Sequence, residues 1–228
     1  ELKAADMGTV MHEALEKFSK KLQENGETWK TVTDDTRDRL IEECVEEPMA
    51  DYGNTIFQSS SRNQYRIIRV KRILKRTVWA LQQQIRQGEF EPGEFEVSFS
   101  MEDSLSAINI DLSEHEKMRL RGRIDRVDLC ETDDKVYVKI IDYKTGNTSL
   151  DLVALYYGLQ LQLAVYLDAA MELEQKKHPG KQVEPAGVFY YHIDDPMLDQ
   201  EEDETDEAWG RRMLKALRMD GLVNADRK

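Results

Sequence analysis

The chain has 228 residues, of which 40% are hydrophobic, and a formal net charge of −13. This length can bury one sizeable core, while the acidic balance argues against a free-standing nucleic-acid-binding protein and still allows a local basic groove. Two distant cysteines, Cys44 and Cys130, and the absence of a signal peptide or an apolar run of membrane-spanning length predict reduced thiols in an intracellular protein. A first residue that is not Met suggests an excised fragment of a longer protein.

The first ninety residues carry helical periodicity. Apolar spacing predicts helices over 6–24, over 34–46 with Pro48 ending the second, and over 61–87. His12 lies beside the apolar stripe of the first helix, four residues after Gly8. A histidine in this position is usually a packed or surface residue, so the local pattern alone assigns it no function.

The third predicted helix carries a basic stripe on a face next to its apolar one. The stripe consists of Arg62, Arg66, Arg69, Arg72 and Arg76, with Lys71 and Lys75 nearby. Such a concentration of positive charge in an acidic chain suits contact with phosphates, whose binding is largely electrostatic. The alternative is a solvated helix face that pairs with acidic neighbours.

From Pro92 the apolar period changes from helical to alternating. Strands are predicted over 95–99, 107–112, 117–131 and 135–144, and the short turn at 133–134 makes the last two an antiparallel hairpin. A helix capped by Thr148 or Ser149 should follow to about 176, then a strand over 187–193, a solvated acidic loop over 194–207 and a helix over 209–219. This order predicts an α/β fold with a mixed sheet flanked by helices and an N-terminal helical portion.

The fourth predicted strand, KVYVKIIDYKTG, ends in two charges. Asp142 and Lys144 continue the row of Val138 and Ile140 on one face, while Asp125 lies on the partner strand of the hairpin beside two arginines. A solvated strand end and a salt-bridged strand would also explain these residues. Two carboxylates that converge on Mg²⁺, beside a lysine that orients or deprotonates water, would suit phosphodiester hydrolysis.

Four motifs occur in one order: DMGTVMHEAL, GRIDRVD, IIDYKTG and GLQLQLAVYL. Together they resemble the PD-(D/E)xK nuclease superfamily and, more specifically, the RecB-like nuclease domains in the B subunit of bacterial AddAB-type ATP-dependent helicase–nucleases. The resemblance extends from Asp6 to about Tyr191. It implies a restriction-endonuclease-like fold in a single domain over 1–228, with a helical portion over 1–90, a sheet core with a crossover helix over 91–195, and an acidic loop and terminal helix over 196–228.

The resemblance also implies roles for particular residues. It makes His12, Asp125, Asp142 and the backbone carbonyl of Tyr143 ligands of Mg²⁺ or Mn²⁺, and Lys144 the catalytic lysine. Gln162 and Tyr166 match an element that lies by the site and contacts DNA. Domains of this family commonly carry an iron–sulfur cluster on four flanking cysteines. Cys44 and Cys130 fit neither that number nor that placement, so we expect the cluster in the parent protein and not in this chain.

The function implied is that of a metal-dependent exonuclease, which cuts single-stranded DNA ends produced by an attached helicase during double-strand-break repair and recombination. Its expected partners are DNA and the A subunit of the helicase–nuclease, in the bacterial cytoplasm at the nucleoid and without a membrane. Two alternatives remain at this point. One is a non-catalytic DNA-binding or scaffolding module that keeps the nuclease fold, and the other is a free-standing exonuclease of the same superfamily.

Overall fold

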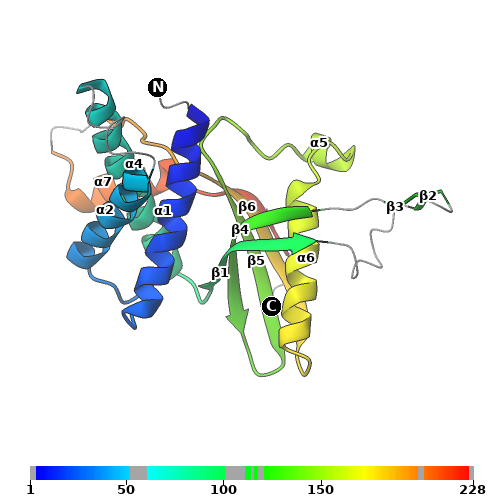
Figure 1. Cartoon of the computed structure of the whole chain (residues 1–228). Helices are drawn as coiled ribbons and strands as arrows, with labels where there is room; N and C mark the ends of the chain where they lie inside the picture. The colour runs from blue at the N-terminus through cyan, green and yellow to red at the C-terminus, as the bar shows by residue number, and fades with distance from the viewer. Residues whose placement is uncertain are drawn as a thin grey trace. The chain divides into compact units, whose positions relative to one another are not determined.

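A computed structural model describes residues 4–51, 61–100, 111–113, 116–117, 121–199 and 203–225. Its helices are α1 Ala4–Glu24, α2 Asp34–Asp51, α4 Ser61–Arg86, α5 Leu152–Tyr156, α6 Gln162–Lys177 and α7 Asp206–Ala216 (Figure 1). Its strands are β1 Glu91–Ser100, β2 Asp111–Ser113, β3 Glu116–Lys117, β4 Arg121–Glu131, β5 Lys135–Lys144, β6 Gln182–His192 and β7 Asp220–Val223.

Five strands form a mixed sheet in the order β1-β4-β5-β6-β7. The pairs β1–β4, β4–β5 and β6–β7 are antiparallel. β6 runs parallel to β5, because the Gln182 amide donates to the Asp134 carbonyl near the start of both strands and the Ile193 amide donates to the Lys144 carbonyl near their ends. Two parallel neighbours need a crossover connection, and α6 supplies it. The predicted mixed sheet flanked by helices is therefore confirmed.

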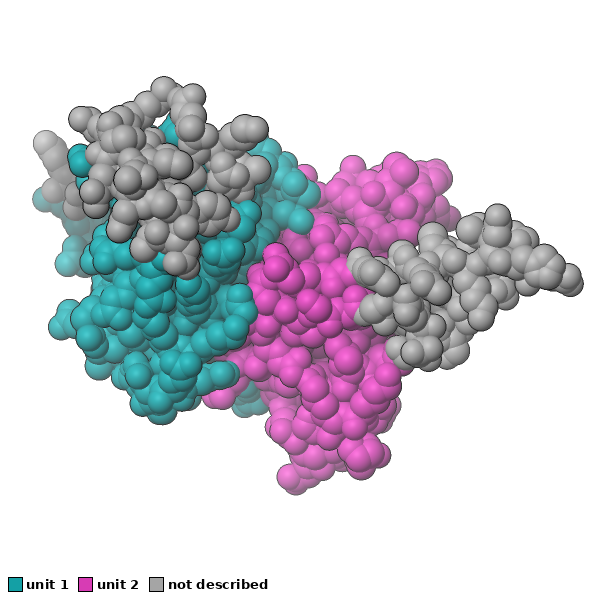
Figure 2. Space-filling model, in the orientation of Figure 1, with its two compact units in different colours: residues 1–89, 143–148, 191–219 teal, residues 90–142, 149–190, 220–228 magenta. Residues whose placement is uncertain are grey.

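The chain divides into two compact units, each built from three segments (Figure 2). Unit 1 contains residues 1–89, 143–148 and 191–219, and unit 2 contains residues 90–142, 149–190 and 220–228. The change from one unit to the other falls within β5, between Asp142 and Tyr143, so the motif that carries the predicted lysine belongs to both units.

Unit 1 is held together by its long helices. α1 packs against α2, and α2 packs against α4, as Figure 1 shows. Leu15, Phe18 and Ile41 are completely buried in this core, as the apolar periodicity of the sequence predicts. A smaller apolar cluster joins α4 to α7 through Trp79 and Trp209. Removal of so much apolar surface from water is the main term that stabilises this unit.

Unit 2 has its core between the sheet and α6. Val138 and Ile140 of β5 pack with Leu163 and Ala169 of α6 in one cluster of buried side chains. The apolar row of β5 thus faces the crossover helix, as period-2 alternation predicts. This packing fixes the start of α6, where Gln162 lies, relative to the end of β5, where Asp142 lies.

The helix predicted from 148 to 176 is wrong as a single element. The structure has the short α5 and the separate α6, with Asp151 rather than Thr148 or Ser149 as the N-cap residue of α5. Gly158 has a φ of +74°, a left-handed conformation that ends a helix. Because the chain turns here, Leu152 and Leu159 of the predicted apolar stripe are exposed.

Three smaller predictions also differ from the structure. α2 continues past Pro48 to Asp51, since a proline so close to the helix end removes only a late backbone hydrogen bond. Of the strand predicted over 107–112, residues 107–110 lie outside the described part, and 111–112 belong to β2, which pairs with β3 in a separate two-stranded sheet. Within the predicted last helix, residues 217–219 are not helical, and β7 was not predicted.

The predicted solvated character of the acidic loop is only partly right. Asp195 pairs with Arg72 and Arg76 of α4, and Glu204 accepts two hydrogen bonds from Arg212 of α7. The loop is therefore attached to unit 1 by charge pairs. Within the part of the chain that the structure describes, no helix is long and apolar enough to cross a membrane.

Candidate active site

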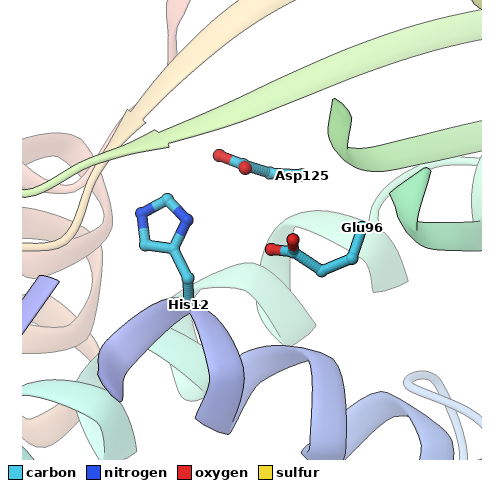
Figure 3. Close-up of side chains that lie close together, drawn as sticks. All are labelled: His12, Glu96 and Asp125. Carbon is cyan, nitrogen blue, oxygen red and sulfur yellow. The ribbon is translucent and has the colours of Figure 1, made fainter. Parts of the chain in front are cut away.

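Two carboxylates face each other across adjacent strands of unit 2. Phe95 pairs with Arg126 and Val97 pairs with Ile124, so Glu96 of β1 lies opposite Asp125 of β4. A carboxylate oxygen of each lies within 4.8 Å of the other, and Figure 3 shows the two side chains. Glu96 has a φ of +51°, which is uncommon for a residue other than glycine and is found where a local site constrains the backbone.

Asp142 lies on the third strand at the same level. The pairing of β4 with β5 is regular from Glu131↔Val136 as far as Arg126↔Ile141, and it ends there. Asp125 and Asp142 are therefore the first residues beyond the paired part of two neighbouring strands. Both side chains are buried. Neighbouring carboxylates supply the oxygen ligands that hard divalent cations prefer, so this end of the sheet is a candidate cation site.

The start of α6 approaches Asp142 with an amide group. Gln162 Nε2 donates to Asp142 Oδ1 at 3.4 Å and to the Tyr166 hydroxyl at 3.0 Å. Gln162 and Tyr166 are four residues apart on α6, so they share one face of the helix. The structure thus brings together, within unit 2, three residues that were predicted separately for metal and DNA contact.

Gly122 of the GRIDRVD motif allows a close approach at this place. A Cβ atom at position 122 would lie 2.6 Å from Phe99 Cζ and 2.9 Å from Tyr166 Cε1. The rings of Phe99 and Tyr166 meet edge to face with centroids 5.6 Å apart. The missing side chain of Gly122 therefore leaves the space that seats Tyr166 beside Gln162.

Arg126 and Asp128 of the GRIDRVD motif form a separate buried network, while the exposed Arg123 pairs with Glu96. Arg126 donates two hydrogen bonds to Asp128, at 2.5 and 2.8 Å, and Lys139 of β5 lies 2.9 Å from the same carboxylate. Burial alone would raise the pKa of the Asp128 carboxyl, but the charges and hydrogen bonds of Arg126 and Lys139 outweigh it and hold this pKa below its usual range. This network joins β4 to β5 next to Asp125 and Asp142.

Unit 1 carries the other predicted metal ligands. A Cβ atom at Gly8 of α1 would lie 3.1 Å from Thr145 Oγ1, so α1 passes closely over the turn after β5. One helical turn later the ring of His12 meets the ring of Tyr143 edge to face, with centroids 5.8 Å apart. The Tyr143 ring in turn contacts Tyr191 of β6 in the same way. Figure 3 shows His12 projecting from α1, and Lys144 is half buried at the end of β5.

The C-terminal half of the predicted basic stripe is paired with acidic groups of unit 1. Arg72 and Arg76 bind Asp195, and the nearby Lys71 and Lys75 bind Glu46 and Glu42 of α2. Arg69 is exposed and Arg66 half buried, and the side chain of Arg62 lies outside the described residues. The pairing alternative therefore describes the C-terminal half of the stripe. These four paired cations also line a cavity of about 610 Å³ together with Arg37, Asp38, Glu42, Ile68, Trp79 and Trp209.

Comparison with known proteins identifies the family. A sequence model of the PD-(D/E)XK nuclease superfamily matches residues 1–225. The chain belongs to this superfamily. It is 48% identical over 222 residues to the B subunit of the ATP-dependent helicase/deoxyribonuclease of Lachnoclostridium phytofermentans, a match that covers 97% of this chain and 18% of that protein. The corresponding B subunits of Alkaliphilus metalliredigens and Alkaliphilus oremlandii are 41% and 39% identical, each over 99% of this chain and 20% of its relative. The chain thus spans about a fifth of the length of these relatives.

The superfamily is named for two acidic residues and a lysine, and Asp125, Asp142 and Lys144 stand in that order here. The structure adds Glu96, which sequence reasoning missed because it reads as one of the polar residues that alternate with Phe95 and Val97. Its signal is the strand register, which a sequence does not display. The role of Asp128 was missed as well, although its spacing of two from Arg126 places both on one face of β4.

The two cysteines of this nuclease chain are buried singly, Cys44 in α2 and Cys130 in β4. Burial raises the pKa of the Cys44 thiol to about 11, which makes it inert as a ligand near neutral pH. Two thiols in different elements do not supply the four thiolates of an iron–sulfur cluster. The residues present therefore do not fit that group, and no step of the chemistry depends on it.

Proposed function

We propose that this chain is the nuclease domain in the B subunit of an ATP-dependent helicase–nuclease and hydrolyses DNA phosphodiester bonds with a divalent cation, Mg²⁺ or Mn²⁺. Membership of the PD-(D/E)XK superfamily supports nuclease chemistry. The names of its relatives support DNA as the substrate and a helicase–nuclease as the setting. The proposal includes exonucleolytic cutting of the single strands that the helicase produces, with the A subunit as partner and with double-strand-break repair and recombination as the process served.

The observation that carries the proposal is the opposition of Glu96 and Asp125. Arg123 pairs with Glu96, and Asp125 lies opposite Glu96 on the adjacent strand. Their carboxylate oxygens approach within 4.8 Å at a place where a third carboxylate, Asp142, is also buried. A hard divalent cation prefers oxygen ligands, so a donor set of three carboxylates fits Mg²⁺ or Mn²⁺.

In the proposed mechanism each of these protein groups has a separate role. Glu96, Asp125 and Asp142 would hold the cation with oxygen atoms, and His12 and the Tyr143 carbonyl are proposed as further ligands. A cation bound there lowers the pKa of water and polarises a phosphoryl oxygen. The Gln162 amide keeps Asp142 oriented by its hydrogen bond to Oδ1. The Lys144 ammonium would orient the attacking water and offset the charge that develops on the phosphoryl group.

DNA contact is proposed at two places. The shared face of Gln162 and Tyr166 lies beside Asp142, so it would position the strand at the carboxylates. Arg66 and Arg69, in the N-terminal half of the basic stripe, would contact phosphates. Arg62, Arg72 and Arg76 remain weaker candidates, the last two because an acidic side chain already neutralises them.

The experiment is cleavage of end-labelled single-stranded DNA by the chain in MgCl₂, in MnCl₂ and in EDTA, with Lys144→Ala and Lys135→Ala compared. Lys135 lies on the same strand and pairs with Glu184 away from the carboxylates, so its substitution is the matched control. We expect metal-dependent cleavage that Lys144→Ala reduces by at least a hundredfold and that Lys135→Ala leaves within twofold. Metal binding without any cleavage, in the chain and in a full-length B subunit alike, would support a scaffolding module instead.

A further inference from the structure

A short segment of unit 2 exposes an unusual amount of apolar surface. Between the end of β5 and the start of α6, six large apolar side chains are between 50% and 84% exposed: Leu152, Val153, Tyr156, Tyr157, Leu159 and Leu161. We call residues 152–161 the apolar segment. Isolated exposed apolar residues are normal on protein surfaces, but a contiguous set of this size marks an interaction site.

The apolar segment is held in one conformation by polar groups at its base. Asp151 Oδ1 accepts hydrogen bonds from the backbone amides of Val153 and Ala154. The Gln160 side chain bridges back across the segment, accepting from the Asp151 amide at 2.9 Å and donating to the Ser149 carbonyl at 3.0 Å. The Leu159 amide closes the turn on the Ala154 carbonyl. These bonds join the two ends of the segment, so its backbone is already ordered. Binding a partner through the apolar side chains therefore costs little further conformational entropy.

The chemistry of the segment favours a protein surface over a nucleic acid. No Lys or Arg occurs between residues 145 and 175, whereas Asp151, Asp168, Glu172 and Glu174 do. Nucleic-acid binding draws most of its affinity from cations that neutralise phosphates, and this region supplies none. Tyr156 and Tyr157, whose rings meet edge to face at 5.3 Å, are the residue type enriched at the energetic centres of protein interfaces.

We infer that the apolar segment docks on an apolar protein surface within the larger polypeptide of the B subunit, outside the region matched by this chain. The relatives in which this domain occurs carry about four fifths of their length outside that region, which is ample sequence to cover the segment. This inference rests on the proposed assignment to a helicase–nuclease polypeptide, but not on nuclease activity. Docking of the apolar segment would also affect the carboxylate site. The segment ends directly at Gln162, so docking would hold the start of α6, and with it the amide that orients Asp142.

The test compares solvent access at position 156 in the isolated chain and in a full-length B subunit that carries this domain. Tyr156→Cys is labelled with a maleimide, and the peptide that contains position 156 is quantified by mass spectrometry. Cys44 and Cys130 are buried, and peptide resolution separates all other cysteines. Met197→Cys, at an exposed position of unit 1, is the matched control for reagent access.

We expect Tyr156→Cys to be labelled at least tenfold more slowly in the full-length protein than in the isolated chain, while Met197→Cys changes by less than twofold. We also expect the Tyr156→Ser/Leu159→Ser double variant to keep the melting temperature of the isolated chain and to lower that of the full-length protein. Equal labelling of Tyr156→Cys in both proteins overturns the inference. The inference is also overturned if the isolated chain dimerises and the double variant abolishes the dimer. A tenfold loss of oligothymidylate binding in the double variant overturns it as well. Metal binding by the chain is independent of all these results, so the inference and the proposed function fail separately.

Discussion

Glu96 of β1 and Asp125 of β4 occupy facing positions of adjacent strands, with a carboxylate oxygen of each within 4.8 Å of the other. Arg123 pairs with Glu96 and offsets part of the repulsion between the two carboxylates. A site built in this way is organised for its ligand before the ligand arrives. A cation would be held by carboxylates of both strands, which ties metal affinity to the register of the two strands.

Glu96→Gln should have different effects on stability without and with metal. In EDTA we expect the free energy of unfolding to change by less than about 1 kcal/mol, since the substitution removes both the repulsion from Asp125 and the ion pair with Arg123. In saturating MnCl₂ the variant should gain less stability from the ion than the wild type does, because a ligand is missing. Urea unfolding in both conditions measures the two effects, with Glu89→Gln, an exposed carboxylate next to β1, as control. A large loss of stability in EDTA would show that Glu96 is a structural residue.

Gly122→Ala should disturb the site through Tyr166. The added methyl would lie under 3 Å from the rings of Phe99 and Tyr166, both of which pack on the core of unit 2. We expect a loss of about 1–3 kcal/mol in unfolding free energy, which is typical of overpacking, and weaker binding of single-stranded DNA as the Tyr166 hydroxyl moves from Gln162. A Gly180→Ala variant, whose new methyl meets nothing within 4 Å, controls for the change of residue type. An unchanged free energy of unfolding would mean that the rings of Phe99 and Tyr166 move aside without cost.

Asp128 should make the stability of the chain depend on acid. Its carboxyl has a lower pKa when folded than when unfolded, so it stabilises the fold above its unfolded pKa of about 3.9 and loses that contribution as the pH falls below this value. Asp128→Asn should cost about 3–5 kcal/mol at pH 7, as is usual when one partner of a buried ion pair is removed. The variant should also show a shallower loss of stability between pH 5 and pH 3. Urea titrations between pH 5 and pH 3 measure the stability of both variants, with Asp133→Asn, a substitution of an exposed turn residue, as control. If Asp128→Asn loses as much stability in acid as Asp133→Asn does, Asp128 is not the source of the acid dependence.

The basic stripe should separate into two classes of residue. Arg69→Ala should weaken binding of single-stranded DNA and lower the slope of log K against log salt by about 0.7 per lost phosphate contact. Arg76→Ala should leave the slope unchanged and reduce stability by about 1 kcal/mol, because Arg76 binds Asp195 and stacks over Trp209. Fluorescence anisotropy at several salt concentrations distinguishes them. An equal change of slope in both variants would place the whole stripe in the DNA groove.

The features that the sequence predicted well are those with a local pattern. The alternation of β5 places Asp142 and Val138 correctly because neighbouring residues decide a strand, and the spacing of four puts Gln162 and Tyr166 on one helix face. Glu96 could not be predicted, since its meaning depends on which residue of another strand lies opposite. The break before α6 was missed because leucines continue at helical spacing through Gly158, while the turn there depends on the hydrogen bonds of Gln160.

The metal site is tested most directly by a titration of MnCl₂ into the chain, followed by calorimetry. The wild type is measured beside Asp125→Asn, Asp142→Asn and Asp134→Asn, the last of which is a control in an exposed turn. We predict saturable Mn²⁺ binding in the wild type and in Asp134→Asn, and at least a tenfold loss of affinity in Asp125→Asn and in Asp142→Asn. Circular dichroism should show an intact fold in all four proteins. Equal Mn²⁺ affinity in Asp125→Asn, Asp142→Asn and the wild type would contradict the assignment of these carboxylates as the metal site.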